Sequence, residues 1–228
     1  FDLEDDPDHF EGDYTPGSSN WNANSFQAKL DAISQVIEDI DADLIGLQEV
    51  ESESALRALA DRLRARGVLD YPHLSLSPTG DPRGIAIGIL SRYPLKRAVS
   101  RPISQSYTCA SGAELTGSPP EARPIFEVNL WGSDDDYQLT LLFNHWKSRA
   151  SDDGECRVAE HHQRGGEQIQ GLMSQWMADD PQRAVLVLGD FNAQEVEPSL
   201  TTALDTALDR MDLLSPSSLY NLWGDLGV

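Results

Sequence analysis

The segment Val185-Leu-Val-Leu-Gly-Asp-Phe-Asn192 constrains the fold of this 228-residue chain more than any other. Its four apolar residues predict a buried strand that ends at Gly189, so Asp190 and Asn192 follow where the strand reaches the surface. Side chains at positions i and i+2 point to the same side of an extended backbone, which places this carboxylate and carboxamide together. The end of this strand therefore suits chemistry on a charged group.

Two other expected strands also end in polar side chains. Asp43-Leu-Ile-Gly-Leu-Gln-Glu49 ends in an amide and a carboxylate, and the strand over residues 138–145 ends in a histidine. Mg²⁺ takes one or two carboxylates and keeps several waters, so Glu49 and Asp190 suit this ion. A histidine titrates near neutral pH and can transfer a proton. One candidate site is therefore formed by Glu49, His145, Asp190 and Asn192.

The residues that follow His145 extend this candidate site. Lys147 and Arg149 come directly after it in a chain with few other cations, and they suit a phosphate. Trp146 lies between His145 and Lys147 in the sequence and is a candidate for stacking on a nucleobase.

Each candidate residue is also compatible with an ordinary structural role. A carboxylate at a strand end often caps a turn or a helix, and a lone histidine there is more often structural than catalytic. Gly189-Asp-Phe-Asn192 is also compatible with an Asx turn. His161 and His162 fall in the polar start of a helix and are expected to face solvent. The repeated context of the four candidates, rather than any one residue, favours a shared site.

Periodicity predicts both helices and strands. The first helix has apolar residues at helical spacing from Phe26, with Asn24 or Ser25 as its cap. We expect helices over residues 25–40, 52–66, 157–177 and 198–211, and strands over residues 43–50, 84–90, 124–131, 138–145 and 184–191. Residues 104–122 are expected to form a long loop and residues 132–136 a hairpin turn. Hairpins beside alternating elements favour an α/β fold with stacked mixed sheets and outer helices.

The composition limits the size and the partners of the protein. The length supports one domain over residues 1–228, and no apolar run approaches the ~20 residues of a membrane span. With 38 acidic and 17 basic residues the formal net charge is -21, as on protein surfaces from saline habitats, where salt screens self-repulsion. Such a surface repels nucleic acid, so a polyanionic substrate requires a divalent cation at the site.

The two cysteines, Cys109 and Cys156, leave two alternatives open. Both lie in polar segments, so they either form a disulfide, as in an oxidising compartment, or remain free thiols. They are too few to form a zinc cluster by themselves. A start at Phe1 rather than Met is consistent with a removed leader. We expect a periplasmic or extracellular location, with the cytoplasm as the alternative.

Four motifs occur in a specific order, namely Leu47-Gln-Glu-Val50, Gly84-Ile-Ala-Ile-Gly-Ile-Leu-Ser-Arg92, Asn144-His145 and Gly189-Asp-Phe-Asn192. In this order and at these spacings they resemble the endonuclease/exonuclease/phosphatase superfamily, which has the deoxyribonuclease I-like fold. The likeness covers nearly the whole chain and is greatest to the bacterial nuclease-like branch. It implies a four-layer α/β sandwich of two mixed β-sheets flanked by helices, and metal-dependent hydrolysis of phosphodiesters or phosphomonoesters.

The resemblance also implies a role for each residue that matches a motif. Glu49 corresponds to the metal ligand, for Mg²⁺ or Mn²⁺, with Ca²⁺ as an alternative. His145 corresponds to the histidine that contacts the scissile phosphate or assists the leaving oxygen. Asp190 corresponds to the residue that orients or activates the attacking water, and Asn192 to the stabiliser of the pentacovalent phosphorane.

Three basic residues are the candidates for binding substrate. Arg123, just before the strand over residues 124–131, matches a position often used on the substrate backbone. Arg83 is a second position of the same kind. Lys147 is the third candidate, because it follows the motif histidine.

The chain departs from the family pattern at both ends. The first strand of the family ends in an Asn of the metal site, and the last strand carries an Asp-His pair. This sequence begins after the first position and reaches Val228 without the second. We therefore expect a domain trimmed at both ends, lacking its first and last strands, with a degenerate domain as the alternative.

The most specific hypothesis for the function is an endonuclease-like phosphodiesterase in which water attacks the phosphorus in line. One alternative is a phosphatase or phosphodiesterase for small or lipid phosphoesters, which the acidic composition and the scarcity of lysine favour. The other is a catalytically incomplete domain of the same fold. The sequence indicates no protein partner.

Overall fold

The computed structural model describes residues 22–67, 70–79, 81, 84–103, 107–108, 114–115, 123–131, 138–149, 155–213, 215–222 and 225. Of residues 107–108, 114–115, 131, 138 and 155–157 it describes the backbone alone. Several expectations therefore lie outside the described residues: Arg83, both cysteine side chains, and the hairpin turn at residues 132–136.

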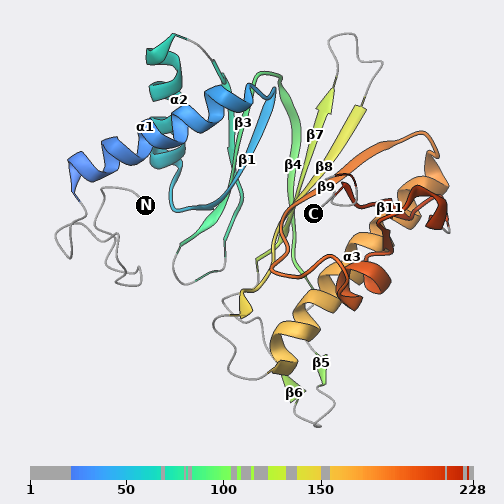
Figure 1. Ribbon diagram of the computed structural model, residues 1–228. Coiled ribbons are helices and arrows are strands. Elements are labelled where there is room, and N and C mark those ends of the chain that lie inside the picture. Colours follow the sequence, from blue (N-terminus) through green and yellow to red (C-terminus); the bar gives the residue numbers. More distant parts are fainter. Residues whose placement is uncertain are drawn as a thin grey trace.

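Two β-sheets stack face to face between two layers of helices (Figure 1). The helices are α1 (Ala23–Ile40), α2 (Glu53–Arg66) and α3 (Glu155–Asp179). The first sheet has the order β1-β3-β2, with β1 (Leu44–Val50), β2 (His73–Leu76) and β3 (Ala86–Ser91). The second has the order β4-β7-β8-β9, with β4 (Leu95–Arg101), β7 (Ile125–Trp131), β8 (Gln138–His145) and β9 (Ala184–Asp190). The α/β sandwich expected from the sequence is confirmed.

Short elements fill two regions where the expectations fail in part. Strand β5 (Tyr107–Thr108) pairs with β6 (Glu114–Leu115) inside the expected long loop, and β10 (Thr206–Ala207) pairs with β11 (Leu219–Tyr220). The expected helix over residues 198–211 is wrong, because the short helical segments η2 (Ser199–Ala203) and η3 (Arg210–Asp212) form there with β10 between them. Asp205, with φ 56°, interrupts the right-handed helical conformation between them.

The ends of the first two helices follow from side-chain chemistry. Asn22 caps α1, since its side-chain oxygen accepts from the backbone N–H groups of Asn24 and Ser25 at 2.9 and 3.3 Å. The cap therefore lies two residues before the nearer of the two expected positions. Ser52 caps α2, where its hydroxyl accepts a backbone N–H at 3.1 Å. Gly67 ends α2 at φ 73°, a left-handed conformation that glycine adopts without strain.

Three hydrophobic clusters hold the four layers together. The cluster between the two sheets contains Ile87, Ile89, Phe126, Val128, Leu141 and Phe143. The cluster between α1, α2 and the first sheet includes Leu30, Leu56, Leu63, Tyr71 and Leu90. The cluster between α3 and the second sheet includes Ile125, Leu142, Trp146, Ile169 and Met173. Burial of one such side chain is worth roughly 1.5–3 kcal/mol, so the packing fixes how the two sheets meet.

Strand β9 is less buried than the sequence predicts. Leu186, in the middle of the apolar run, is 48% exposed. Within the described residues, β9 pairs only with β8, and β1 pairs only with β3. A strand at the edge of a sheet lacks a neighbour on one side, which leaves part of its surface accessible.

The end of β9 approaches β8 unusually closely. The two strands are parallel, with Gly189 opposite Asn144 and Asp190 opposite His145. Gly189 has φ 131°, and a Cβ atom there would lie 1.9 Å from the carbonyl oxygen of Asn144. Only glycine fits this position, because any side chain would collide with backbone rather than with a movable group.

Gly189→Ala should therefore lower the free energy of unfolding by about 3 kcal/mol or more, from backbone strain and overlap together. The matched control is Gly171→Ala on α3, where a Cβ atom meets nothing within 4 Å. It should raise stability by up to about 1 kcal/mol, because alanine favours a helix over glycine. Urea denaturation of the two variants measures both effects, and similar stabilities for both would contradict the close approach.

Candidate active site

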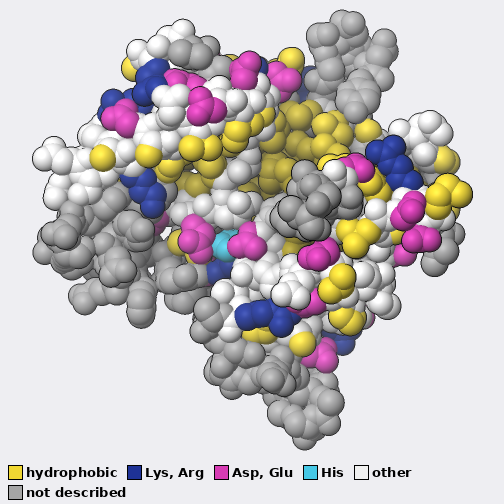
Figure 2. Space-filling model, viewed as in Figure 1, with side chains coloured by type: hydrophobic (Ala, Val, Ile, Leu, Met, Phe, Trp, Pro, Cys, Tyr) yellow, Lys and Arg dark blue, Asp and Glu magenta, His cyan; other side chains and the backbone are white. Residues whose placement is uncertain are grey.

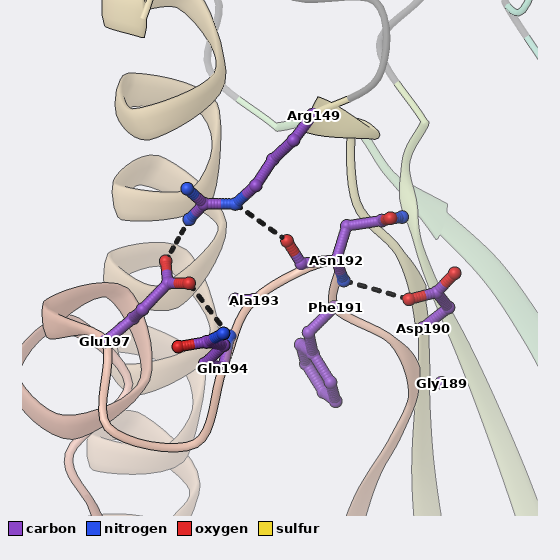
Figure 3. A pocket seen from close by; sticks show the side chains of 8 residues that line it. All are labelled: Arg149, Gly189, Asp190, Phe191, Asn192, Ala193, Gln194 and Glu197. Atoms are coloured by element: carbon purple, nitrogen blue, oxygen red, sulfur yellow. Dashed lines mark hydrogen bonds and ion pairs between the residues drawn. The ribbon is translucent and has the colours of Figure 1, made fainter.

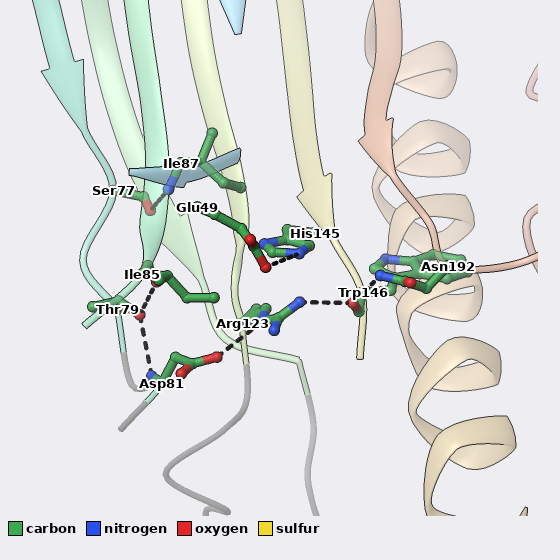
Figure 4. Close-up of polar contacts among 10 residues, drawn as sticks. All are labelled: Glu49, Ser77, Thr79, Asp81, Ile85, Ile87, Arg123, His145, Trp146 and Asn192. Carbon is green, nitrogen blue, oxygen red and sulfur yellow. Dashed lines mark hydrogen bonds and ion pairs between the residues drawn. The ribbon is translucent and has the colours of Figure 1, made fainter. Parts of the chain in front are cut away.

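His145 lies between carboxylates that come from both sheets. The parallel register of β8 and β9 sets it opposite Asp190. Strand β1 of the other sheet brings Glu49, whose Oε1 lies 3.8 Å from Nε2 of His145 (Figure 4). Figure 2 shows a histidine between acidic side chains in a recess of the surface. The structure thus brings together three of the four residues that end the predicted strands.

A β-bulge presents Glu49 to this recess. The pairing of β1 with β3 shifts register between Leu47 and Val50, and Glu49 has φ 60°. A non-glycine residue in this left-handed region costs about 1–3 kcal/mol, which the surrounding sheet must offset. The consequence is that Val50 is buried while the Glu49 side chain remains 58% exposed beside His145.

An Asx turn fixes the fourth residue, Asn192. Its backbone N–H donates to Oδ1 of Asp190 at 2.9 Å, and its φ is 48°. The Asx turn that the sequence allows is therefore present, and it holds the Asp190 carboxylate. The other carboxylate oxygen, Oδ2, has no hydrogen bond within the described part of the chain. That oxygen remains available to a ligand or a water.

The backbone of Trp146 connects these residues. Its N–H donates to the carbonyl oxygen of Asp190 at 2.8 Å. Its carbonyl oxygen accepts from Nδ2 of Asn192 at 2.9 Å and from Nη1 of Arg123 at 3.0 Å (Figure 4). The expectation that Trp146 stacks on a base is wrong, because its side chain is only 1% exposed. It packs edge-on against Phe191, with ring centroids 4.9 Å apart.

Arg123 supports the site from the interior. Its side chain is buried, and Nε donates to Oδ2 of the buried Asp81 at 3.2 Å. Sequence reasoning missed Asp81, since it follows no apolar run or motif. Lys147 is half-buried just beyond Trp146. Contact of Arg123 and Lys147 with a substrate stays a prediction.

The environment of His145 keeps its ring neutral. Burial lowers the pKa of His145 to about 4, and the Arg123 guanidinium acts in the same direction. The carboxylates of Glu49, Asp190 and Asp81 oppose this shift without overcoming it. At neutral pH the imidazole therefore carries one N–H donor and one acceptor nitrogen.

His161 and His162 do not face solvent as expected, since they are 7% and 1% exposed. Gly165 explains their burial, because a Cβ atom there would lie 2.9 Å from the Trp146 ring and its absence lets α3 approach closely. Nε2 of His162 bonds the carbonyl oxygen of Lys147 at 2.8 Å, so that nitrogen carries the proton. Both ring nitrogens of His161 lack a hydrogen-bond partner among the described residues, and burial lowers the pKa of His161 to about 4.

A pocket opens beside Asp190 (Figure 3), lined by Arg149, Gly189, Asp190, Phe191, Asn192, Ala193, Gln194 and Glu197. Arg149 donates from Nε to the carbonyl oxygen of Asn192 at 3.2 Å and forms an ion pair with Glu197. Glu197 also accepts the backbone N–H of Gln194 at 2.9 Å. Sequence reasoning missed Glu197, which follows the last motif by only five residues.

The donor set around Glu49 suits a divalent cation of the magnesium type. No group of three or more His, Cys, Asp or Glu side chains among the described residues could hold a metal. Mg²⁺ does not require one, because it binds through one or two carboxylates and completes its shell with water and substrate oxygens. The exposed Glu49 carboxylate, beside neutral His145, offers that kind of open coordination.

Comparisons with known proteins agree with this geometry. The model of the Endonuclease/Exonuclease/phosphatase family matches residues 1–226, and the chain belongs to this family. Three solved structures are similar in fold. Truncated TDP2 from Caenorhabditis elegans has TM-score 0.53 at 15% identity, over 76% of this chain and 58% of that chain. Sphingomyelinase C from Streptomyces griseocarneus has TM-score 0.58 at 16% identity, over 79% and 62%. The mannosyl-6-phosphatase Bt3783 from Bacteroides thetaiotaomicron has TM-score 0.55 at 15% identity, over 78% and 61%.

These likenesses show the fold. The chain spans less than two thirds of each of the three solved chains. A search of curated proteins gave no match. No helix in the described ranges is long and apolar enough to cross a membrane.

The burial of His161 predicts a pH dependence of stability. Between pH 6.5 and 4 the unfolded chain binds a proton at this histidine and the folded chain does not, so stability falls as the pH is lowered. His161→Leu should reduce that fall by up to about 3 kcal/mol and should also remove two unpaired ring nitrogens. Urea denaturation at pH 7 and pH 4.5 measures the fall in the free energy of unfolding between the two pH values. His73→Leu, a half-buried histidine on β2, is the control, and an equal pH dependence in both variants would refute the effect.

Proposed function

We propose that the protein is a metal-dependent phosphodiesterase that cleaves by in-line attack of water. The observation that carries the proposal is the buried His145 between the carboxylates of Glu49 and Asp190. Membership of the Endonuclease/Exonuclease/phosphatase family supports it. So do the names of two structural neighbours, a sphingomyelinase and a phosphatase.

Each of the four residues has a defined task in this proposal. Glu49 would hold Mg²⁺ or Mn²⁺, and the bound ion would polarise a phosphoryl oxygen and stabilise the leaving group. Asp190, oriented by the N–H of Asn192, would accept a hydrogen bond from the attacking water at Oδ2, which no described residue bonds. His145, neutral at working pH, would donate its ring N–H to a phosphoryl oxygen as negative charge develops there.

Asn192 has two tasks in the same step. One hydrogen of its side-chain amide bonds the carbonyl oxygen of Trp146, which fixes the plane of the amide. The second hydrogen would then be aimed at the phosphoryl group without a rotation at the moment of reaction. A donor fixed in advance stabilises the transition state more than one that must reorient.

The substrate is the point on which two candidate functions differ. An endonuclease must bind a polyanion, whereas this chain has a formal net charge of -21. That charge favours the second candidate, hydrolysis of small or lipid phosphoesters. Nicking of a supercoiled plasmid against hydrolysis of a small aryl phosphodiester discriminates the two, because only a nuclease prefers the plasmid.

Glu49→Gln and Asp190→Asn should each lower kcat for a phosphodiester by about 100- to 10,000-fold while the fold persists, because each removes a charge needed in the transition state. Glu53→Gln, on the exposed face of α2, is the matched control and should retain full activity. Chelation of divalent ions should abolish hydrolysis, and Mg²⁺ or Mn²⁺ should restore it.

Initial rates, with circular dichroism to verify folding, check these outcomes. Near-normal turnover of Asp190→Asn would remove this residue from the chemistry. Hydrolysis that persists in the chelated protein would rule out the metal.

A further inference from the structure

The pocket next to Asp190 contains one cation, Arg149, whose contacts with Asn192 and Glu197 leave part of its guanidinium unused among the described residues. Arg149 is the sole Lys or Arg among the residues that line the described pocket. We propose that this pocket binds a second phosphate group, adjacent to the phosphodiester that is cleaved, and that Glu197 holds the Arg149 guanidinium in place until that phosphate arrives. This inference rests on the phosphodiesterase function proposed above and adds a substrate class to it.

The position of the pocket follows from one residue that both sites share. Asn192 donates its N–H to Asp190 at 2.9 Å and accepts Nε of Arg149 on its carbonyl oxygen at 3.2 Å (Figure 3). These two contacts and the length of one residue place the guanidinium within about 10 Å of the Asp190 carboxylate. A phosphate bound there would belong to the same substrate molecule as the phosphodiester at His145.

The Arg149 guanidinium has N–H donors that its contacts with the described residues do not use. An arginine carries five N–H groups in a planar fork that matches a phosphate. Within the described residues, Nε bonds Asn192 and Nη2 bonds Glu197, which leaves the Nη1 side of the fork without a partner. The Arg149 side chain is 56% exposed, so that side is open to a ligand.

A bound phosphate can displace Glu197 from Arg149. The ion pair of Glu197 with Arg149 is exposed on the arginine side, and such pairs contribute little stability in water. A terminal phosphate offers more charge and more acceptor oxygens than a carboxylate, and a phosphodiester offers two oxygens that match the arginine fork, so either can take over the Nη donors. Glu197 keeps its second bond, from the backbone N–H of Gln194, and so remains ordered after it releases Arg149.

The charge of the protein gives the pocket its selectivity. Most of the surface repels an anion, and the buried Arg123 is already engaged by Asp81. Arg149 therefore provides a local attraction at one fixed distance from the reacting centre. A substrate with one phosphate gains nothing from it, whereas a substrate with two is bound at both.

Such a second phosphate has two chemical sources. It is either the next phosphodiester of a nucleic acid strand or a terminal phosphate group on a small phosphoester. A thymidine dinucleotide with one internal phosphodiester is the reference ligand. The same dinucleotide with a terminal phosphate and a thymidine trinucleotide with two phosphodiesters represent the two sources.

The test uses three variants in binding and in kinetics. The variants are Arg149→Gln, Glu197→Gln and, as control, Arg57→Gln, which removes the arginine of a comparable exposed ion pair with Glu53 on α2. Calorimetry with chelated protein gives Kd without turnover, and initial rates with Mg²⁺ give KM.

Arg149→Gln should raise Kd and KM for the two-phosphate ligands about 10-fold more than for the reference dinucleotide, the size of one charge-assisted hydrogen bond. Glu197→Gln should lower both constants for those ligands severalfold, because the competing carboxylate is gone while the bond to Gln194 persists. The control should change neither. A response to the terminal phosphate alone identifies a small phosphoester, and an equal response to the trinucleotide identifies a strand.

Equal effects of Arg149→Gln on all three ligands, or a weaker affinity in Glu197→Gln, would overturn the second phosphate site even if the enzyme cleaves phosphodiesters. Absence of hydrolysis together with the predicted order of Kd values would instead sink the phosphodiesterase function and leave the binding site standing. The two proposals therefore fail in different measurements.

Discussion

The site depends on the hydrogen bonds that the backbone carbonyl oxygen of Trp146 accepts. That oxygen accepts the side-chain amide of Asn192 and the guanidinium of Arg123, which occupies both of its lone pairs. The N–H of the same residue bonds the backbone of Asp190. One residue, directly after β8, thus sets the position of two side chains and of the end of β9. Gly189 has no Cβ atom, so it can lie against the backbone of Asn144, and this contact brings the end of β9 to Trp146.

The sequence predicts the strand ends well, because a short apolar run followed by Gly-Asp or Gln-Glu is typical of a buried strand that reaches the surface. Because β8 and β9 are parallel neighbours, the register of their pairing brings His145 opposite Asp190. The bulge that turns Glu49 outward leaves no local signal, since it depends on how β1 pairs with β3. The burial of His161 and His162 depends on the close packing of Gly165 against Trp146, which follows β8 rather than lying on α3, so polar composition alone misleads.

Local and overall charge oppose each other in this protein. The formal net charge of -21 repels phosphate at long range, yet a buried Arg123 and an exposed Arg149 are each bonded to a residue that also bonds Asp190. Salt screens the long-range repulsion but acts much less on buried or partly buried pairs. High ionic strength therefore weakens the opposing field more than it weakens the attraction at the buried Arg123. An acidic surface and the phosphate site proposed above are compatible under those conditions.

Asn192 links the reacting centre to the pocket of Arg149 through separate polar atoms. Its N–H holds Asp190, its carbonyl oxygen holds Arg149, and its side chain holds Trp146. Its left-handed backbone, φ 48°, is what lets the N–H and the carbonyl oxygen reach these partners from a single residue. Any ligand that bonds the Arg149 guanidinium therefore acts on the same residue that orients the Asp190 carboxylate. The position of the Asp190 carboxylate and the affinity of the Arg149 pocket for a ligand are coupled at Asn192, because this one strained residue bonds both side chains.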